Sequence, residues 1–499
     1  MKLSELLAHL PEAERLDPGD PEVTAVECDS RRVVPGALFA AVPGSRTDGH
    51  AYVRAAVEAG AVACLISRDV PAPGAVRVRV ADPERALGRA ADAFWGHPSR
   101  RLRLVGITGT NGKTTTAFLV QHLLERAGWL TGRIGTVGYA FPSGEMPAPL
   151  TTPDAPLLQR SLARLVREGA KAAVVEVSSH ALSRQRVEGC RWACAAFTGL
   201  SQDHLDYHRT MEAYFQAKRL LFARYAHDAP AAVNADDPYG RRLLDELGSR
   251  AVPYGLHAGE IRFRVEEAGP SGLRGRVCTP RGEVEAELPL PGRFNALNAA
   301  CALAVAACLG LDPLDAAGHL ADAPRVPGRL EVIPNTLGFA VYVDYAHTPD
   351  ALDRVLETVA TVTPHRVIVV FGCGGDRDPG KRPLMARAAA QHAHAVVLTA
   401  DNSRSEPTEH IMDQIEAGLP AGWTRARHPA ELAAADRTYA RVPDRAEAIR
   451  WAVAAARSGD AVVIAGKGHE TTQTLGERVI PFDDRHEARR ALAERERAA

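Results

Sequence analysis

Apolar positions follow two different spacings along the chain, and the two alternate. Near the N-terminus, helical spacing at 53–57 is followed by an unbroken apolar run at 61–66, which is typical of a buried strand. The run 102–108 also predicts a strand. Apolar positions between 120 and 127 then recur at i, i+3, i+4 and i+7, and Gly128 is placed to end that helix. Alternating strands and helices indicate a mostly parallel sheet covered on both faces.

The middle of the chain adds strands and one change of pattern. Further strands are predicted at 172–177 and 195–200. Residues 261–290 instead contain short alternating runs separated by Gly-Pro-Ser-Gly and Pro-Arg-Gly, which is typical of antiparallel hairpins. An alanine-rich helix is expected from Asn298 to Leu309.

A second alternating pattern starts near Val332 and predicts a Rossmann-like layer. The arginine- and alanine-rich tail from Glu487 is expected to be a solvated terminal helix. The segment from His97 to Arg101 is expected to be a linker, because Pro98 disfavours helix at the residue before it. The predicted strands of this last layer are 340–343, 367–371, 395–398 and 461–464.

Length and composition agree with a three-domain α/β protein. The 499 residues provide for about three domains of ordinary size. Lys+Arg number 60 and Asp+Glu 61, which argues against a broad nucleic-acid-binding surface. The N-terminus lacks the apolar core of a secretory signal, and no apolar stretch reaches membrane-spanning length, so a cytoplasmic protein is expected. Cys190 and Cys194 are weak evidence for a metal, and reduced buried thiols are favoured.

A glycine-rich turn joins the strand at 102–108 to the helix after it, which is the context that a P-loop requires. Its glycines allow backbone N–H groups to surround phosphate oxygens at a helix N-terminus. Lys113 would reach the β- and γ-phosphates, and the Thr114 hydroxyl would ligate Mg²⁺. The general motif has glycine where Ile107 stands, so the turn is a tighter variant. The loop residues are Gly109, Thr110, Asn111, Gly112, Lys113, Thr114 and Thr115.

Polar residues follow the next strands of this predicted sheet. Glu176 interrupts an apolar strand near its carboxyl end, where ligands gather in doubly wound sheets. A carboxylate is costly to bury there unless it meets a cation, which makes Glu176 a good candidate Mg²⁺ ligand. His204 follows the next strand, although imidazole is an unusual ligand for Mg²⁺.

These motifs, in this order, resemble the Mur ligases of bacterial cell-wall synthesis, and the resemblance covers nearly the whole chain. It is most similar to the tripeptide synthetases, which add a diamino acid to the D-glutamate of a UDP-muramoyl dipeptide. The further motifs that carry the resemblance are Glu176–His180, Asp203–His208, Lys218, Asn295–Asn298, Pro327–Glu331, Asp344–Pro349, Gly374–Asp378, Lys381–Met385, Asp401–Arg404 and Gly466–Glu470.

The resemblance implies an ATP-dependent ligase of peptidoglycan synthesis, with ATP as co-substrate and Mg²⁺ as cofactor. The D-glutamate γ-carboxylate would attack the γ-phosphate of ATP to give an acyl phosphate, which the incoming amine would open. It also implies three domains. Residues 1–98 would bind the UDP-muramoyl substrate, 99–331 would form the P-loop ATP-binding domain with a small antiparallel part, and 332–499 would form a Rossmann-like domain for the incoming amino acid.

The resemblance also assigns residues to the catalytic and nucleotide sites. Thr114, Glu176 and His204 would bind Mg²⁺, and Lys218 would be carbamylated to add a further oxygen ligand. The implied catalytic set is Lys113, Glu176, His204, Lys218 and Arg329. Besides the loop itself, the implied ATP contacts are Asn295, Asn298, Arg329 and Asp344. From the residues alone, Asn295 and Asn298 are helix caps and Lys218 is a surface lysine.

Two further groups match the family's substrate positions. The implied UDP-muramoyl-peptide contacts are Ser30, Ser45, Arg46, Thr47, Thr151, Thr152, Ser178 and Arg186, with Arg184 left out. The implied amino-acid contacts are Arg382, Asp401, Asn402, Ser403, Arg404, Gly466 and Glu470.

The motif Asp401-Asn402-Ser403-Arg404 bears on which amino acid is added. Relatives that use meso-diaminopimelate carry proline at the third position, and their arginine binds the distal carboxylate of the substrate. Arg404 is present here, whereas Ser403 lacks the fixed φ of proline. We favour diaminopimelate, with L-lysine or L-ornithine as the alternative.

Other classes remain as competing hypotheses. They are a folylpolyglutamate synthetase, the ligase that adds D-alanyl-D-alanine, and a P-loop ATPase that forms no amide. The expected partners are small molecules alone, for a monomer that binds no nucleic acid and inserts in no membrane.

Overall fold

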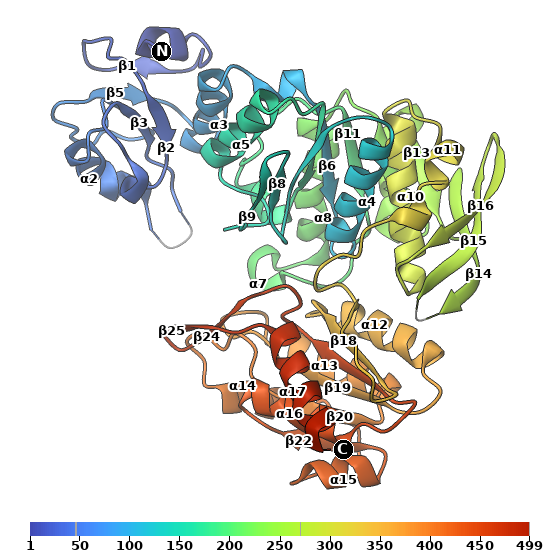
Figure 1. The fold of residues 1–499 in the computed structure, drawn as a ribbon. Coiled ribbons are helices and arrows are strands. Elements are labelled where there is room, and N and C mark those ends of the chain that lie inside the picture. The colour runs from blue at the N-terminus through green and yellow to red at the C-terminus, as the bar shows by residue number, and fades with distance from the viewer. Residues whose placement is uncertain (45–46, 270, 499) are drawn as a thin grey trace.

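The computed structural model describes residues 1–44, 47–269 and 271–498, which form three sheets flanked by helices (Figure 1). The first sheet has the order β1-β5-β4-β3-β2 and is parallel except for β1. Apolar residues of α1 (Leu3–Leu7) and α3 (Pro83–Phe94) cover one face, and those of α2 (Val53–Glu58) cover the other. Its strands are β1 (Glu14–Arg15), β2 (Ala25–Glu27), β3 (Ala37–Ala40), β4 (Ala63–Ile66) and β5 (Val76–Arg79).

The second sheet has eleven strands in the order β16-β15-β14-β13-β12-β11-β6-β10-β7-β8-β9. The seven strands from β14 to β7 in this order are parallel, and antiparallel hairpins extend both edges, so the predicted mixed architecture is confirmed. The strands are β6 (Arg103–Thr108), β7 (Thr131–Ile134), β8 (Tyr139–Phe141), β9 (Gly144–Met146), β10 (Ala172–Glu176), β11 (Cys194–Phe197), β12 (Ala231–Asn234), β13 (Ala251–Gly255), β14 (Ile261–Gly269), β15 (Gly272–Thr279) and β16 (Gly282–Leu288).

Helices bury apolar side chains on both faces of the second sheet, as a parallel sheet requires. One face is covered by α4 (Lys113–Arg126) and α10 (Arg293–Cys308), which pack against each other. The short α11 (Pro313–Ala317) follows α10. The other face is covered by α5 (Ala155–Arg167), α6 (Ser179–Ser183), α8 (Met211–Leu220) and α9 (Pro238–Leu247), and α7 (Leu205–His208) leads into α8.

The third sheet lies below the second in Figure 1 and has the order β17-β18-β23-β19-β20-β22-β21. All its neighbours are parallel except β17 and β18. One face is covered by α12 (Pro349–Val362), α13 (Lys381–His392) and α14 (Thr408–Glu416). The strands are β17 (Glu331–Val332), β18 (Ala340–Asp344), β19 (Val367–Phe371), β20 (Ala395–Leu398), β21 (Thr424–Arg425), β22 (Thr438–Arg441) and β23 (Ala461–Ala465), with a separate hairpin of β24 (Thr472–Leu475) and β25 (Arg478–Pro481).

The C-terminal helix is not the freely solvated element that its composition predicted. Together with α15 (Pro429–Ala434) and α16 (Arg445–Ala455), α17 (Asp484–Ala498) covers the other face of the third sheet. It buries Ala488, Ala491 and Leu492. Its exposed charged residues are Arg489, Arg490, Glu494, Glu496 and Arg497. The apolar stripe is narrow and alanine-rich, so the charged positions dominate the sequence signal.

The helix predicted from Asn298 begins earlier, at Arg293. Gly292 is its N-cap, and the amide of Asn295 donates to the carbonyl of Pro291 at 2.7 Å. The prediction that Asn295 and Asn298 cap the helix is therefore wrong, because both asparagines lie inside the helix. The linker at Pro98–Arg101 forms a short 3₁₀ turn after His97.

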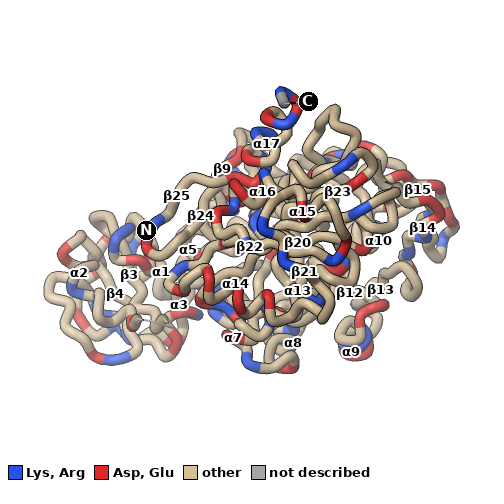
Figure 2. Tube along the Cα trace, turned by 90° about the horizontal axis from the view of Figure 1, so that it is seen from below, with Lys and Arg blue, Asp and Glu red and all other residues tan. Residues whose placement is uncertain are grey.

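Charges of both signs are interspersed over the elements visible in Figure 2. On the β14–β16 hairpins, Arg274 pairs with Glu287 and Arg276 with Glu283 across neighbouring strands. Such exposed pairs add little stability but leave no field of one sign. Among the described residues, no helix combines the length and apolarity needed to cross a bilayer.

Candidate active site

The predicted P-loop lies between β6 and α4. Gly109 and Gly112 have φ values of 151° and 84°, a region that favours glycine. A Cβ on Gly109 would come within 1.9 Å of the Thr198 hydroxyl, and one on Gly112 within 2.4 Å of the Asn298 side chain. Any side chain at either position would therefore clash with its neighbours. The turn places its backbone N–H groups at the N-terminus of α4, where an anion can bind.

The ammonium of Lys113 lies against this same turn. Its Nζ donates to the carbonyls of Gly109 and Thr110, both at 2.8 Å. Burial lowers the pKa of Lys113. A half-buried cation that is bonded only to neutral carbonyls has charge available for an anion such as a phosphate.

Glu176 is the last residue of β10 and is fully buried beside the loop. Its carboxylate accepts hydrogen bonds from the Thr114 hydroxyl at 2.9 Å, and from the Thr136 N–H and hydroxyl at 2.9 and 3.0 Å. All these donors are neutral, so a cation beside Glu176 would balance its charge. Thr136, which follows the neighbouring strand β7, holds both oxygens and was not among the predicted site residues.

Lys218 is buried, although a helical lysine taken alone is expected at the surface. Its Nζ donates to the carbonyl of Gly109 at 2.7 Å and lies 4.6 Å from the ring centre of Tyr214. Burial and the nearby ammonium of Lys113 lower the pKa of Lys218 well below its usual value. This lowering favours the neutral, nucleophilic form of the amine beside Gly109 of the phosphate loop.

His204 stands at the start of α7 with a positive φ of 53°. Its Nε2 lies 3.3 Å from the Asp203 carboxylate, and its ring lies 4.9 Å from that of His180. Burial lowers the pKa of His204 to about 3, so the imidazole is neutral and its ring nitrogens can act as ligands.

The oxygen donors here fit Mg²⁺ better than a softer metal. Thr114 and Glu176 present a hydroxyl and a carboxylate side by side, as hard divalent cations prefer. Within the described ranges, no cluster of three or more His, Cys, Asp or Glu side chains has the spacing of a metal site. The site therefore fits an ion held by one or two protein oxygens together with phosphate oxygens.

Arg329 joins the segment that leads into the third sheet to the phosphate loop. Its Nη2 donates to the Thr114 hydroxyl at 3.1 Å, and its guanidinium stacks 4.5 Å from the ring centre of Tyr345. Asp344 accepts the backbone N–H groups of Leu330 at 2.6 Å and Ala346 at 2.7 Å, and burial raises its pKa. Asp344 thus fixes this inter-sheet segment, a role that its predicted ATP contact did not include.

The two asparagines of α10 lie behind the loop. Asn298 donates to the Asn295 side-chain oxygen at 3.0 Å, and its own oxygen lies beside Gly112. Both side chains are buried.

A cavity of about 650 Å³ opens between the second and third sheets and contains most of the predicted nucleotide and metal residues. Its walls include α12, where Asp350 accepts a hydrogen bond from the Asn111 amide at 2.8 Å. Asp203, Asp237 and His257 also line it, and motif reasoning did not single them out as site residues. The predicted residues that line it are Thr110–Thr115, Thr151, Glu176, Ser178, His204, Asn298, Arg329 and Asp344.

Four of the predicted peptide-binding residues form one chain of contacts next to Glu176. The Thr152 hydroxyl donates to the Glu176 backbone carbonyl at 2.8 Å and accepts the Ser178 N–H at 3.0 Å. Arg186 donates to the Thr152 carbonyl at 2.9 Å, and Thr151 lies 3.1 Å from the Thr136 hydroxyl. This cluster leads from the cavity towards the first sheet.

The predicted residues of the first sheet lie apart from the cavity. Ser30 begins a 3₁₀ turn and Thr47 is exposed, while Ser45 and Arg46 lie outside the described residues. Arg184, which the sequence analysis left out, donates to the Pro43 carbonyl at 2.7 Å and pairs with Glu84 at 2.5 Å. It therefore connects the central part to the loop that contains Thr47, and only the fold reveals this contact.

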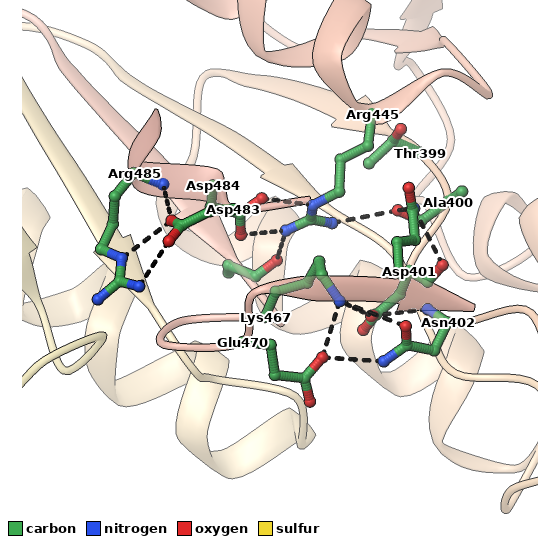
Figure 3. A network of polar contacts seen from close by, with 12 residues as sticks. Thr399, Ala400, Asp401, Asn402, Arg445, Lys467, Glu470, Asp483, Asp484 and Arg485 are labelled. Atoms are coloured by element: carbon green, nitrogen blue, oxygen red, sulfur yellow. Dashed lines mark hydrogen bonds and ion pairs between the residues drawn. The ribbon is translucent and has the colours of Figure 1, made fainter. Parts of the chain in front are cut away.

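Except for Arg382 in α13, the predicted amino-acid residues follow the carboxyl ends of β20 and β23 in the third sheet; Asp401, Asn402 and Glu470 are seen in Figure 3. Asn402 donates to Glu470 at 2.9 Å, and Gly466, with a φ of 118°, turns the chain beside Asp401. Arg404 is half-buried, has a φ of 51° and donates to the Gly375 carbonyl at 2.6 Å, and Ser403 before it is buried.

Arg382 lies deeper than the other predicted amino-acid residues. It is fully buried, and its two Nη atoms are bonded to Glu406, Gln414 and Gly374. Its Nη2 therefore supports the loop at Gly374 through a hydrogen bond to that residue's carbonyl at 3.2 Å.

The fold and this cavity define a P-loop nucleotide-binding protein whose third Rossmann-like unit faces the phosphate loop. The chain belongs to the Mur ligase family. The family's catalytic domain matches residues 22–95, its middle domain 107–306 and its glutamate ligase domain 328–468. The chain is accordingly an ATP-dependent, amide-bond-forming ligase.

Two curated relatives are similar over nearly their whole length. A UDP-N-acetylmuramoyl-L-alanyl-D-glutamate--2,6-diaminopimelate ligase from Geobacillus thermodenitrificans (strain NG80-2) is 44% identical over 502 residues, which cover 99% of this chain and 100% of the relative. One of the same name from Synechococcus sp. (strain WH7803) is 45% identical, with 94% of each chain covered.

Solved structures share the fold. A UDP-N-acetylmuramoyl-L-alanyl-D-glutamate--2,6-diaminopimelate ligase superposes with a TM-score of 0.67 at 32% identity, covering 99% of this chain and 100% of that one. A MurF ligase from Thermotoga maritima in complex with ADP has a TM-score of 0.64 at 18% identity, covering 95% and 98%, and shows the common fold alone.

Proposed function

We propose that the chain joins meso-2,6-diaminopimelate to the D-glutamate γ-carboxylate of UDP-N-acetylmuramoyl-L-alanyl-D-glutamate, with cleavage of ATP, in peptidoglycan synthesis. The observation that carries the proposal is the meeting of Glu176 and Arg329 on the Thr114 hydroxyl, in a cavity that Lys113 also lines and next to the peptide-binding cluster. The names of the full-length relatives support the choice of substrates.

In this proposal the protein side chains neutralise and align three anionic groups. Lys113 and the N–H groups of the phosphate loop bind the phosphates, and Arg329 neutralises charge on the transferred phosphoryl group. Thr114, Glu176, His204 and a carbamylated Lys218 would hold Mg²⁺, which supplies charge neutralisation to the phosphate oxygens when bound. Arg186 and the hydroxyls of Thr151, Thr152 and Ser178 orient the peptide carboxylate towards the γ-phosphate.

The acyl phosphate then loses phosphate as the amine of the diamino acid attacks its carbonyl carbon. The third unit, 332–499, presents that amine, while 1–98 binds the UDP-muramoyl end and 99–331 binds ATP. Contacts such as Asn111–Asp350 already join the second and third units across the cavity, which supports closure on the substrates. The proposed enzyme acts as a cytoplasmic monomer on small-molecule substrates alone.

The choice of diaminopimelate rests on Arg404 and Glu470, which offer a guanidinium for the distal carboxylate and a carboxylate for an ammonium group. Lysine and ornithine lack that distal carboxylate and would leave Arg404 without a partner.

A substrate panel tests the proposal. Purified chain with Mg²⁺ and the UDP-muramoyl dipeptide is given ATP and either meso-diaminopimelate, L-lysine or L-ornithine, and phosphate release and product mass are measured. We expect a tripeptide product with diaminopimelate only, and no phosphate release without the dipeptide. A product with lysine or ornithine instead would change the amino acid assigned, and ATP cleavage without acceptor or product would overturn the ligase itself.

A further inference from the structure

Two separate loops make up the amino-acid region of the third unit. One follows β20 and contains Asp401, Asn402 and Arg404, and the other follows β23 and contains Lys467 and Glu470. The strands are not neighbours, because β19 lies between them in the sheet. No ladder between β20 and β23 therefore sets the spacing where the two loops begin. One backbone contact joins them further along, from the Arg404 N–H to the Thr474 carbonyl at 3.3 Å. Nearer the strand ends, side chains make the connections described below.

Lys467 connects the two loops directly (Figure 3). Its side chain is completely buried, and its Nζ donates to Glu470 at 2.7 Å and to the Asn402 side-chain oxygen at 3.3 Å, and lies 3.9 Å from Asp401. Glu470 keeps 29% of its side-chain exposure, so a ligand can still reach it. Lys467 thus orients two of the predicted substrate contacts without being exposed itself.

Arg445 makes a second connection, between the residues that precede the two loops. Its Nη1 donates to the Ala400 carbonyl at 3.2 Å and its Nη2 to the Ala465 carbonyl at 2.9 Å, the residues just before Asp401 and Gly466. Asp484, at the start of α17, pairs with Arg445 at 2.7 Å, and neither side chain is exposed. Burying such a pair costs desolvation, which only well-aligned bonds offset. Here two hydrogen bonds from Arg445 to Asp484, at 2.7 and 2.8 Å, hold the guanidinium in one orientation.

We propose that Lys467 and Arg445 are positioning residues for the incoming diamino acid, which set the distance between the two loops that bind it. The proposal rests on the proposed function, because it concerns the substrate assigned there. Neither residue touches the phosphate loop, so their loss should affect the amino acid and not ATP or the peptide substrate.

The experiment compares steady-state constants of Lys467→Met, Arg445→Lys and wild type for all three substrates. Lys467→Met keeps the volume and removes the charge, and Arg445→Lys keeps a cation for Asp484 but cannot reach both carbonyls. The matched control is Arg366→Met, which breaks the ion pair of Arg366 with Asp460 (3.0 Å) at the opposite, amino ends of β19 and β23. Thermal unfolding of each variant shows that the third unit is folded.

In Lys467→Met we expect the KM for diaminopimelate to rise at least about tenfold, as for one lost charge-assisted hydrogen bond. The KM values for ATP and peptide should stay within about twofold, and Arg445→Lys should shift the same constant in the same direction. An unchanged amino-acid KM in both variants, or an equal rise in Arg366→Met, overturns the proposal. A wild-type chain that uses no diamino acid overturns the proposed function as well, so the two failures are distinguishable.

Discussion

The Nζ atom of Lys218 donates a hydrogen bond to the backbone carbonyl of Gly109, with 2.7 Å between Nζ and O. The first glycine of the phosphate loop is thus bonded to a buried lysine of α8, a helix 109 positions away in the chain. Burial strips Lys218 of water and lowers its pKa, which favours the neutral amine that a reaction with carbon dioxide requires.

Replacement of Lys218 by alanine is expected to lower kcat by at least about 100-fold, because it removes both the support of Gly109 and the proposed carbamate ligand. Native mass spectrometry of the wild type in bicarbonate buffer should show an added carbon dioxide that Lys218→Ala lacks. The exposed lysine Lys171 is the control, and Lys171→Ala should keep full activity. Full activity of Lys218→Ala would remove the residue from the mechanism.

Lys113 should matter more for turnover than for folding. Lys113→Met retains the buried volume but loses the cation that faces the phosphates, so we expect kcat to fall roughly 100- to 1,000-fold, or about 3–4 kcal/mol of barrier. Single-turnover phosphate release measures the effect. Unfolding of the variant in urea should begin no earlier than in wild type, since a half-buried cation without a carboxylate hydrogen-bond partner is costly to the fold. Near-normal turnover would contradict the assigned role.

The ion pair of Glu406 with buried Arg382 predicts an acid-sensitive third unit. The hydrogen bonds from Arg382 lower the pKa of Glu406 from 4.5 to about 2. A carboxyl whose folded-state pKa is depressed stabilises the fold fully above its unfolded value, and this stabilisation is lost as the pH falls from about 4.5 towards 2. We expect the stability difference between wild type and Glu406→Gln to shrink over that range. Urea midpoints measured from pH 6 to 3 check this, and parallel curves would count against it.

The strand, turn and helix of the phosphate loop could be predicted from the sequence because their determinants are local. The apolar run, the two glycines and the helical spacing all lie within 102–128. The hairpins of β14–β16 were predicted for the same reason, since alternation and turn residues are short-range signals.

Contacts between distant segments could not be predicted in this way. Thr136 reaches Glu176 only because β7 and β10 pair with Ile134 opposite Val175, a register that no single segment encodes. Arg445 and Asp484 lie 39 positions apart and meet only when α17 packs on the third sheet. The burial of Lys218 likewise depends on which face of α8 the sheet covers. The family resemblance suggested the role of Lys218, whereas its residue type alone favoured a position at the protein surface.

Arg404 should determine the preference of the enzyme for diaminopimelate over lysine. Its Nη1 is bonded to the Gly375 carbonyl at 2.6 Å, which fixes the guanidinium although Ser403 before it lacks the fixed φ of proline. Removal of a charge-assisted contact to the distal carboxylate costs about 1.5–3 kcal/mol, so Arg404→Ala should raise the KM for diaminopimelate roughly 10- to 150-fold. Any residual use of L-lysine should be unaffected or improve, because lysine has no distal carboxylate to lose. The exposed neighbour Arg377 gives the control variant Arg377→Ala, which should retain the preference, whereas an equal loss for both amino acids in Arg404→Ala would show that Arg404 supports the loop and does not select the substrate.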